Sequence, residues 1–328
     1  MAIQMRYLVG LALLPVAISG PAQTKHTIEV TVPVPYVLPR TLVSALKTEA
    51  RCPGNIAGLS FRSVNRNQII VTVSINHSGL YNFLLDTGTQ VTMVDSGIAA
   101  KLQLSTRGTA VVAGIGSHES ASFAILDLLQ VGSHAVANQK VLVYDLHSLH
   151  SADLHIQGIL GLDFLEHFDM LIDNVHSVLC LDDSNAMRAD VRGPHTALAP
   201  PAEVADSFVL PTLMIVEVRL SQSTRPVRLM LDSGANGAIL YNTSKYLALP
   251  PRGYRRWAGV DGRQLMFSAM PPQDLKIGSL EFSGVPFVSL AGTQKDSRAK
   301  GFDGVITTGL FQSVFICYSD HFVVLEPR

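Results

Sequence analysis

Two copies of an Asp-(Thr/Ser)-Gly motif, each at the end of an apolar run, are the residues of this sequence best suited to chemistry. The motif residues are Asp86, Thr87, Gly88, Asp232, Ser233 and Gly234. Short apolar runs are typical of buried strands, so each carboxylate is expected at the end of a strand in dry surroundings. Two carboxylates about 3 Å apart do not ionise together and share a proton instead. One can then accept a proton from a bound water while the other polarises a substrate carbonyl, without a metal, a cofactor or a covalent intermediate.

The residues that follow each aspartate suit this task. Glycine has no Cβ, so Gly88 and Gly234 would let backbone amides approach a carboxylate closely. The hydroxyl groups of Thr87 and Ser233 could fix the chain by hydrogen bonds between the two copies. A single Asp-Thr-Gly also occurs in ordinary turns. The prediction of a shared site therefore depends on the two copies meeting.

The sequence around the two motifs repeats with a constant offset of 146 residues, the difference between positions 86 and 232. The same offset aligns Gly116 with Gly262, Val131–Ser133 with Ile277–Ser279, and Ile159–Leu160 with Val305–Ile306. A register kept from residue 232 to residue 306 without net insertion indicates an internal duplication. Two docked copies related by a pseudo-two-fold axis would bring Asp86 and Asp232 together.

The elements that must hold these residues are mostly short strands, bounded by Gly, Ser, His or Asn. One short helix is expected in each copy, over residues 96–104 and 244–249, and Asp95 is a good N-cap for the first. We therefore predict an all-β molecule of two related lobes, residues 63–183 and 209–328, with an active-site cleft between them. Residues 184–208 are rich in proline and alanine and are interpreted as a linker. Residues 23–62 form an N-terminal extension.

Composition and the N-terminal residues bear on partners and location. The chain has 328 residues, 47% hydrophobic and 16% charged, with a net charge of −1, so neither nucleic acid nor an anionic membrane is expected as a partner. Residues 1–22 are interpreted as a secretory signal peptide, because the apolar run after Arg6 is shorter than the roughly 20 residues of a membrane span. The alternative is a short anchor that stays attached. We expect an exported protein, periplasmic or secreted, with no stable membrane span in the mature chain.

Other residues suited to chemistry have weaker patterns. Cys52, Cys180 and Cys317 are too few and too scattered for a disulfide framework, so buried free thiols are favoured, although one bridge is possible. Residues 145–155 hold three histidines and two aspartates, but their spacing matches no standard zinc site, and a solvated loop is favoured. No metal or cofactor is expected.

Taken together, these motifs resemble the retropepsin-like aspartic proteases, in the form with two lobes in one chain, as in pepsin. The resemblance is carried by residues 86–89 and 232–235, by the glycine-bearing stretches 112–120 and 257–265, and by residues 158–173. It covers about residues 63–183 and 209–328. It departs at Thr307, which stands opposite Gly161 unless Gly309 serves in its place, and at Asp261 in the second glycine-bearing stretch.

The resemblance implies an endopeptidase with Asp86 and Asp232 as its catalytic pair and an extended polypeptide as its substrate. The two glycine-bearing stretches would be flaps that close over the peptide. The flap residues that it implies are Gly114, Ile115, Gly116, Gly259, Val260 and Gly262.

Two alternatives remain open from the sequence. The first is a non-catalytic peptide-binding protein of the cell envelope that uses the same cleft, although the presence of both aspartates argues against it. The second is a homodimer in which each lobe pairs with its like in another molecule. The roughly 25-residue linker gives the two lobes a high effective concentration, which favours a monomer with an intramolecular pair.

Overall fold

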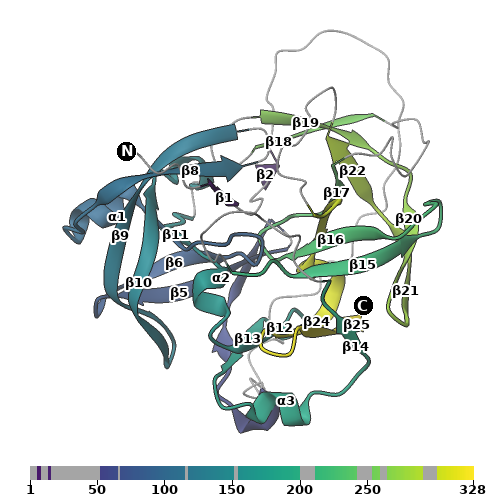
Figure 1. Ribbon diagram of the computed structural model, residues 1–328, viewed down its shortest axis with the longest axis horizontal. Coiled ribbons are helices and arrows are strands. Elements are labelled where there is room, and N and C mark those ends of the chain that lie inside the picture. The colour runs from purple at the N-terminus through teal and green to yellow at the C-terminus, as the bar shows by residue number, and fades with distance from the viewer. Residues whose placement is uncertain are drawn as a thin grey trace, which may run out of the picture.

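The computed structural model describes residues 6–8, 14–15, 52–65, 67–114, 117–150, 154–199, 211–241, 253–258, 264–290 and 301–328. In these ranges the chain is mostly strand, as expected. It forms two lobes that lie side by side, and a third sheet below them is built from both (Figure 1). The all-β, two-lobed architecture predicted from the sequence is therefore confirmed.

The first lobe is built on a nine-stranded sheet with the order β1-β8-β9-β10-β7-β11-β6-β5-β4 over the described residues. Its strands are β1 (Arg6–Leu8), β4 (Arg62–Val64), β5 (Gln68–Ile75), β6 (Ser78–Leu85), β7 (Met93–Asp95), β8 (Arg107–Gly114), β9 (Ser117–Val131), β10 (His134–Tyr144) and β11 (Gly158–Leu160). A two-residue turn joins β5 to β6, and both its residues, Asn76 and His77, have positive φ, as tight hairpin turns require. This hairpin fixes the register of the strand that ends at Asp86.

The second lobe has a ten-stranded sheet with the order β2-β18-β19-β22-β17-β23-β16-β15-β20-β21 over the residues that the structure describes. Its strands are β2 (Leu14–Pro15), β15 (Ile215–Leu220), β16 (Val227–Asp232), β17 (Ala238–Leu240), β18 (Tyr254–Ala258), β19 (Gln264–Ala269), β20 (Gln273–Ile277), β21 (Leu280–Val285), β22 (Phe287–Leu290) and β23 (Gly304–Thr307). Strand β11 runs parallel to β6 with Ile159 opposite Leu84, and β23 runs parallel to β16 with Val305 opposite Met230. Both residues of the second pair are 146 positions after those of the first pair, so the strand before each aspartate has an equivalent parallel partner in the same register.

A six-stranded sheet joins the lobes, and we call it the joining sheet. Its order is β14-β25-β24-β12-β13-β3 among the described residues. Its strands are β3 (Leu59–Ser60), β12 (Asp169–Asp173), β13 (Val178–Asp182), β14 (His195–Ala197), β24 (Phe311–Cys317) and β25 (Phe322–Pro327). The antiparallel pair β12–β24, with Leu171 opposite Phe315, is where one lobe passes into the other.

One apolar core runs through both lobes and one face of the joining sheet. Met170 and Ile172 of the first lobe and Val314 and Ile316 of the second lobe belong to the same buried cluster. Its burial removes apolar surface of both lobes from water at once, so the core favours the docked arrangement over separated lobes.

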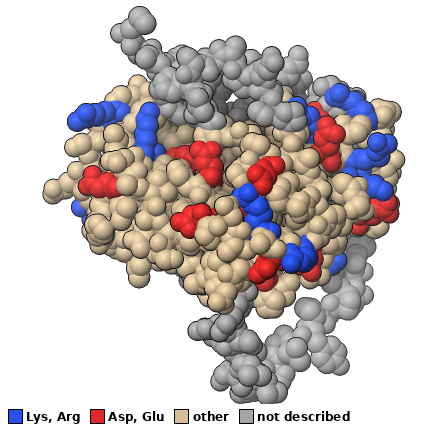
Figure 2. All heavy atoms as spheres, turned by 60° about the horizontal axis from the view of Figure 1, so that its bottom comes forward, with Lys and Arg blue, Asp and Glu red and all other residues tan. Residues whose placement is uncertain are grey.

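On the face of the molecule in Figure 2, acidic and basic side chains are interspersed over the coloured part of the surface.

Three short α-helices and several 3₁₀ turns connect the strands in the described ranges. They are α1 (Ser96–Lys101), α2 (Leu162–Leu165), α3 (Ala186–Asp190), η1 (Pro53–Asn55), η2 (His147–Leu149) and η4 (Thr308–Leu310). The first expected helix is present, and the Gly97 amide donates to Asp95 Oδ1 at 2.9 Å, so Asp95 caps it as predicted. The second expected helix, over residues 244–249, lies outside the described residues.

Part of the segment interpreted as a linker takes part in the fold. Residues 184–208 contain α3 and β14, and β14 forms one edge of the joining sheet. At the other edge, β3 belongs to the N-terminal extension. Sequence segments on either side of the first lobe therefore complete the sheet that holds the lobes together.

Two of the three cysteines are bridged, so the favoured prediction of three free thiols is wrong. Cys52 and Cys180 form a disulfide across a sequence separation of 128 residues, whereas Cys317 is free and buried. The bridge forms because β3 pairs with β13, which brings the chain just before β3 next to the strand that carries Cys180. This pairing is a long-range feature that cysteine spacing does not encode.

The described residues of the N-terminal segment pair with the flap hairpins. Strand β1 runs parallel to β8, with Tyr7 opposite Val112, and β2 runs antiparallel to β18, with Leu14 opposite Ala258. Both strands fall within residues 1–22, the expected signal peptide. No described helix is long and apolar enough to cross a membrane.

Candidate active site

The two aspartates stand at the ends of equivalent central strands. Asp86 directly follows β6, and its amide donates to the carbonyl of Leu160 at 3.0 Å, at the end of β11. Asp232 is the last residue of β16 and lies opposite Thr307, the last residue of β23. Each carboxylate is thus carried by a buried strand that another strand supports in parallel.

A symmetric set of hydrogen bonds ties the two loops together. The Thr87 hydroxyl donates to the carbonyl of Leu231 at 2.8 Å, and the Ser233 hydroxyl donates to the carbonyl of Leu85 at 2.8 Å. In the other direction, the Thr87 amide donates to Ser233 Oγ at 3.1 Å and the Ser233 amide donates to Thr87 Oγ1 at 3.0 Å. Thr87 and Ser233 are fully buried, so these bonds form away from competing water.

Each glycine of the motifs lies against the aspartate of the other lobe. A Cβ on Gly88 would come within 2.6 Å of Asp232 Oδ2, and a Cβ on Gly234 would come within 2.7 Å of Asp86 Oδ2. Real side-chain atoms do not approach this closely, so only glycine fits at these two positions. The exclusion of a Cβ is what allows the two carboxylates to meet at the junction of the lobes.

The carboxylates are held by short hydrogen bonds within their own loops. The Gly88 amide donates to Asp86 Oδ1 at 2.8 Å, and the Gly234 amide donates to Asp232 Oδ1 at 2.7 Å. The Thr89 hydroxyl also donates to Asp86 Oδ2 at 2.7 Å, whereas the equivalent residue Ala235 has no hydroxyl to offer. The bonding of the two carboxylates is therefore unequal although their backbones are alike.

Burial favours the protonated form of Asp86. Both side chains are fully buried. Burial raises the pKa of Asp86 above its ordinary value, and hydrogen bonds from Thr89 and Gly88 and one with Asp232 oppose the rise. A carboxyl group in this position retains a proton to higher pH than a free aspartate does. The arrangement can hold one proton between two acids, one of which is then ready to act as a base.

A third carboxylate, Asp163, supports the first loop through hydrogen bonds with Thr92, and it was not among the site residues predicted from the sequence. The Thr92 amide and hydroxyl donate to Asp163 Oδ1 at 2.9 Å and 2.6 Å, and Gln139 Nε2 donates to Oδ2 at 2.9 Å. The Thr92 hydroxyl also accepts a hydrogen bond from the Gly161 amide at 3.0 Å. Burial raises the pKa of Asp163 to about 7, despite its bonds to Thr92. The signal was present in the sequence as an acidic residue inside the apolar run that follows Gly161.

The second loop is braced differently, by side chains that reach it from the first lobe. Gln68 Nε2 donates to the Gly234 carbonyl at 2.9 Å, and Asn67 Nδ2 donates to the Asn236 carbonyl at 3.0 Å. The position equivalent to Asp163 is Gly309, where a Cβ would come within 2.3 Å of Asn67 Oδ1. The second loop therefore receives two side-chain hydrogen bonds from the first lobe in addition to the symmetric bonds at the junction.

Thr307, where the sequence departs from the expected pattern, is accommodated. In the first lobe, a Cβ on Gly161 would come within 2.9 Å of the backbone of Thr89 and Thr92. Thr307 instead completes β23, and its Oγ1 accepts a hydrogen bond from the Gly309 amide at 3.1 Å. The substitution changes how the turn after the strand is capped, and Thr307 still lies opposite Asp232.

The flap predictions are only partly covered by the described residues. Gly114 ends β8 and lies opposite Ser117, so β8 and β9 form the expected hairpin, and β18 and β19 form a second one. Ile115, Gly116, Gly259, Val260 and Gly262 lie outside the described residues.

In the histidine-rich stretch, the rings of His147, His150 and His155 pack edge to face, and no described group of three His, Cys, Asp or Glu side chains is arranged to hold a metal ion.

Comparison with known proteins gives a family match and similar solved structures. Residues 71–164, within the first lobe, match the family model described as aspartyl protease. Two solved structures are similar to the chain. They are an aspartic proteinase from Irpex lacteus (14% identity, covering 83% of this chain and 97% of that one, TM-score 0.47) and a retropepsin-like aspartic protease from Rickettsia conorii (22% identity, 38% and 90%, TM-score 0.29). Comparison with curated protein sequences gives no match. The resemblance to the aspartic proteases is thus confirmed by the family match, which includes Asp86.

Proposed function

We propose that the protein is an aspartic endopeptidase in which Asp86 and Asp232 activate a water molecule against a peptide carbonyl. The observation that carries this proposal is the junction of the two loops. Paired hydrogen bonds join the two loops there, and the glycine of each motif lies against the carboxylate of the other lobe with no room for a Cβ. An ordinary pair of turns has no need of such an arrangement.

In the proposed mechanism the pair holds one proton in the resting state. The ionised carboxylate accepts a proton from the water as that water attacks the carbonyl carbon. The protonated carboxyl group donates to the carbonyl oxygen, where negative charge develops. The protonated carboxyl group then donates to the leaving amine while the other carboxylate takes a proton from a hydroxyl of the tetrahedral intermediate. The peptide bond breaks, and the pair again holds one proton. Because the two acids titrate as one coupled pair, the acid and base roles belong to both residues together.

The surroundings support this chemistry. Leu84, Leu85 and Leu231 are fully buried and Met230 nearly so, which keeps the region below the pair apolar. Charge interactions are stronger in such surroundings than in water. The amides of Gly88 and Gly234 hold the carboxylates in place before substrate arrives, so little reorganisation is needed during the reaction.

The edges of the flap strands support an extended polypeptide as substrate. Strand β8 accepts β1 and strand β18 accepts β2, so one edge of each flap hairpin can add a strand. An extended peptide that adds to both edges would be held by main-chain hydrogen bonds. Removal of residues 1–22 on export would free both edges for it. The Cys52–Cys180 disulfide supports export, since such bonds persist outside the reducing cytoplasm.

The test uses purified chain without residues 1–22, incubated with an unfolded protein from acid to neutral pH. Asp86→Asn and Asp232→Asn should each lower turnover at least about 10³-fold. The matched control is Asp95→Asn, because Asp95-Ser96-Gly97 has the letters of the second motif, but its carboxylate caps α1 and accepts a hydrogen bond from the Leu146 amide, away from the junction. Cleavage that all three variants retain would overturn the mechanism. Absence of cleavage by the unmutated chain, with peptide still bound, would favour a non-catalytic peptide-binding protein.

A further inference from the structure

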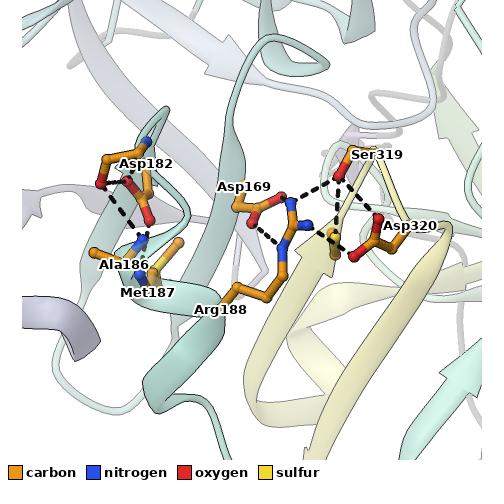
Figure 3. Close-up of polar contacts among 9 residues, drawn as sticks. Asp169, Asp182, Ala186, Met187, Arg188, Ser319 and Asp320 are labelled. Carbon is orange, nitrogen blue, oxygen red and sulfur yellow. Dashed lines mark hydrogen bonds and ion pairs between the residues drawn. The ribbon is translucent and has the colours of Figure 1, made fainter.

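The joining sheet carries a charged cluster at one end, centred on Arg188 of α3 (Figure 3). Arg188 Nε and Nη2 donate to the two oxygens of Asp169 at 2.9 Å and 3.1 Å. Nη1 donates to Asp320 Oδ2 at 2.7 Å, and Nη2 donates to Ser319 Oγ at 2.7 Å. We call these four residues the clasp. One guanidinium thus binds Asp169 of the first lobe, on β12, and Ser319 and Asp320 of the second lobe, in the turn between β24 and β25.

We propose that Arg188 is a positioning residue for the Asp86–Asp232 pair, because it fastens the second lobe to the first, and that the Cys52–Cys180 disulfide holds the helix that carries it. This inference rests on the proposed function, since its kinetic readout is peptidase activity. It concerns a region remote from the motifs that carry the catalytic proposal.

The clasp has two arms, the Arg188–Asp169 ion pair and the Arg188–Asp320 ion pair, and they differ in burial. The Asp169 side chain is only 4% exposed, so its charge needs the bidentate partner that Arg188 provides. The Asp320 side chain is 55% exposed. Loss of the Asp320 arm leaves no buried charge unpaired, so the link to the second lobe can be cut without unfolding the first.

Helix α3 has only five residues, too few to be stable alone, so its position depends on what holds it. Asp182 at the end of β13 accepts hydrogen bonds from the amides of Ser184 and Met187, both at 2.7 Å. At the other end of the helix, the Gly54 amide of η1 donates to Asp190 Oδ2 at 2.9 Å. The end of the first lobe therefore fixes the start of the helix, and the N-terminal extension fixes its last residue.

The disulfide lies directly beneath this helix. Met187 is fully buried in one cluster with Cys52 and Cys180. Turn η1, which follows Cys52, approaches α3 so closely that a Cβ on Gly54 would come within 2.6 Å of the Ala186 backbone. Cleavage of the disulfide would leave η1 without its covalent tie to β13. Since η1 and Cys52 support α3, the position of Arg188 would loosen as well.

The strands that the clasp joins lead to the two aspartates. In the first lobe, β12 follows α2, which follows β11, the strand beneath Asp86. In the second lobe, β24 follows η4, which follows β23, the strand beneath Asp232. A slide of β24 along β12 would therefore displace Asp232 relative to Asp86. Displacements of about 1 Å can cost about 10²-fold in rate.

The kinetic test compares variants of the two arms in the oxidised chain. Asp320→Ala should lower kcat about tenfold with KM changed less than about twofold, and Arg188→Lys, which loses the bidentate geometry, should lower it further. The matched control is Lys276→Ala, because the Lys276–Glu281 ion pair is exposed and lies within the second lobe. Unchanged kcat in Asp320→Ala and Arg188→Lys would overturn the proposal.

Reduction tests the part played by the disulfide. A dithiol gives two electrons and two protons to the Cys52–Cys180 bond and becomes a cyclic disulfide itself, which leaves two thiols on the protein. Reduction should lower kcat of the unmutated chain about tenfold, but that of Asp320→Ala less than about twofold, because both changes act through the clasp. If the fold-losses of kcat caused by reduction and by Asp320→Ala multiply, the disulfide does not act through Arg188.

A distance measurement separates this proposal from the proposed function. Spin labels on Leu80→Cys and Gln222→Cys, exposed sites in the two lobes, report how the lobes sit in any variant, active or not. The labels are attached through thioether bonds, which a dithiol does not cleave. A narrow distance distribution should broaden in Asp320→Ala and on reduction, and stay narrow in Lys276→Ala. A distribution that stays narrow throughout would overturn the clasp even if the chain is an active peptidase. Broadening in a chain without peptidase activity would support the clasp and count against the proposed function alone.

Discussion

The two lobes place equivalent strands in the same register but differ in continuity. The first lobe has two long strands after its flap turn, β9 with 15 residues and β10 with 11. With the offset of 146 residues, the counterpart of β9 is split into β19 and β20, and that of β10 is split into β21 and β22. Pro271, Pro272 and Pro286 stand at the breaks, and proline cannot donate to a strand ladder. The second lobe thus retains the site-bearing strands with a less continuous sheet around them.

The loops that carry the aspartates also differ in which lobe supplies the side chains that support them. The first loop is braced inside its own lobe, by Asp163 through Thr92 and Gly161. The second loop is held by Gln68 and Asn67, which belong to the other lobe. The comparison teaches that these two supports of the second loop form only when the lobes dock, whereas the Asp163 support of the first loop lies within one lobe.

The symmetric hydrogen bonds between the loops should give the largest effect. Thr87→Val leaves the Leu231 carbonyl and the Ser233 amide without their partner, and Ser233→Ala leaves the Leu85 carbonyl and the Thr87 amide in the same state. Each variant should lower the free energy of unfolding by about 2 to 6 kcal/mol, since each buried unpaired group costs about 1 to 3 kcal/mol. Urea unfolding measures this. A large loss in only one of the two variants would contradict the symmetry of the junction.

Asp163 should make the stability of the first lobe depend on pH. Its pKa is raised from 3.8 to about 7, so the folded protein binds a proton that the unfolded chain releases. The stabilisation by this proton is complete below about pH 4 and is lost as the pH rises to about 7. Relative to Asp163→Asn, the unmutated chain should lose on the order of 4 kcal/mol over this window.

Urea unfolding of both proteins at several pH values tests this difference. Gly309 at the equivalent place in the second lobe offers no such group, so the pH dependence should trace to the first lobe alone. Parallel pH curves for the two proteins would mean that folding does not raise the pKa of Asp163.

The glycine that the second lobe lacks gives a third comparison. Gly161→Ala places a Cβ 2.9 Å from backbone atoms of Thr89 and Thr92, and should cost about 3 kcal/mol of stability. Thr307→Gly removes a side chain whose hydroxyl caps the next turn, introduces no clash, and should cost about 1 kcal/mol. Thermal unfolding of the pair measures both. Equal losses would indicate that the two positions are under the same constraint after all.

The contacts that reach from the first lobe to the second should give the smallest of these effects. Gln68→Ala removes the hydrogen bond to the Gly234 carbonyl and the one that Gln68 Oε1 accepts from Asn65, and should cost about 1 to 2 kcal/mol of stability with a several-fold loss of kcat. Gln90→Ala removes an interlobe bond to the Pro211 carbonyl, away from the second loop, and should leave kcat nearly unchanged. Equal kcat losses would show that Gln68 has no special part in placing Asp232.

The sequence predicted the features that local pattern encodes. The two motifs follow apolar strands, Asp95 caps α1, and the offset of 146 residues aligns the strands beneath both aspartates. It did not predict features that arise only when distant segments meet. The Cys52–Cys180 bridge depends on β3 joining β13, and β14 and α3 depend on the joining sheet that they complete. Asp163 was overlooked because a carboxylate within an apolar run is stable there only with the partners that Thr92 and Gln139 supply.

The most direct measurement compares turnover of Asp86→Asn, Asp232→Asn and the variant with both substitutions. If the carboxylates of the two lobes act as one unit, the double variant loses no more activity than either single variant. Losses that multiply, or a single variant that keeps most of its turnover, would contradict a shared site between the lobes.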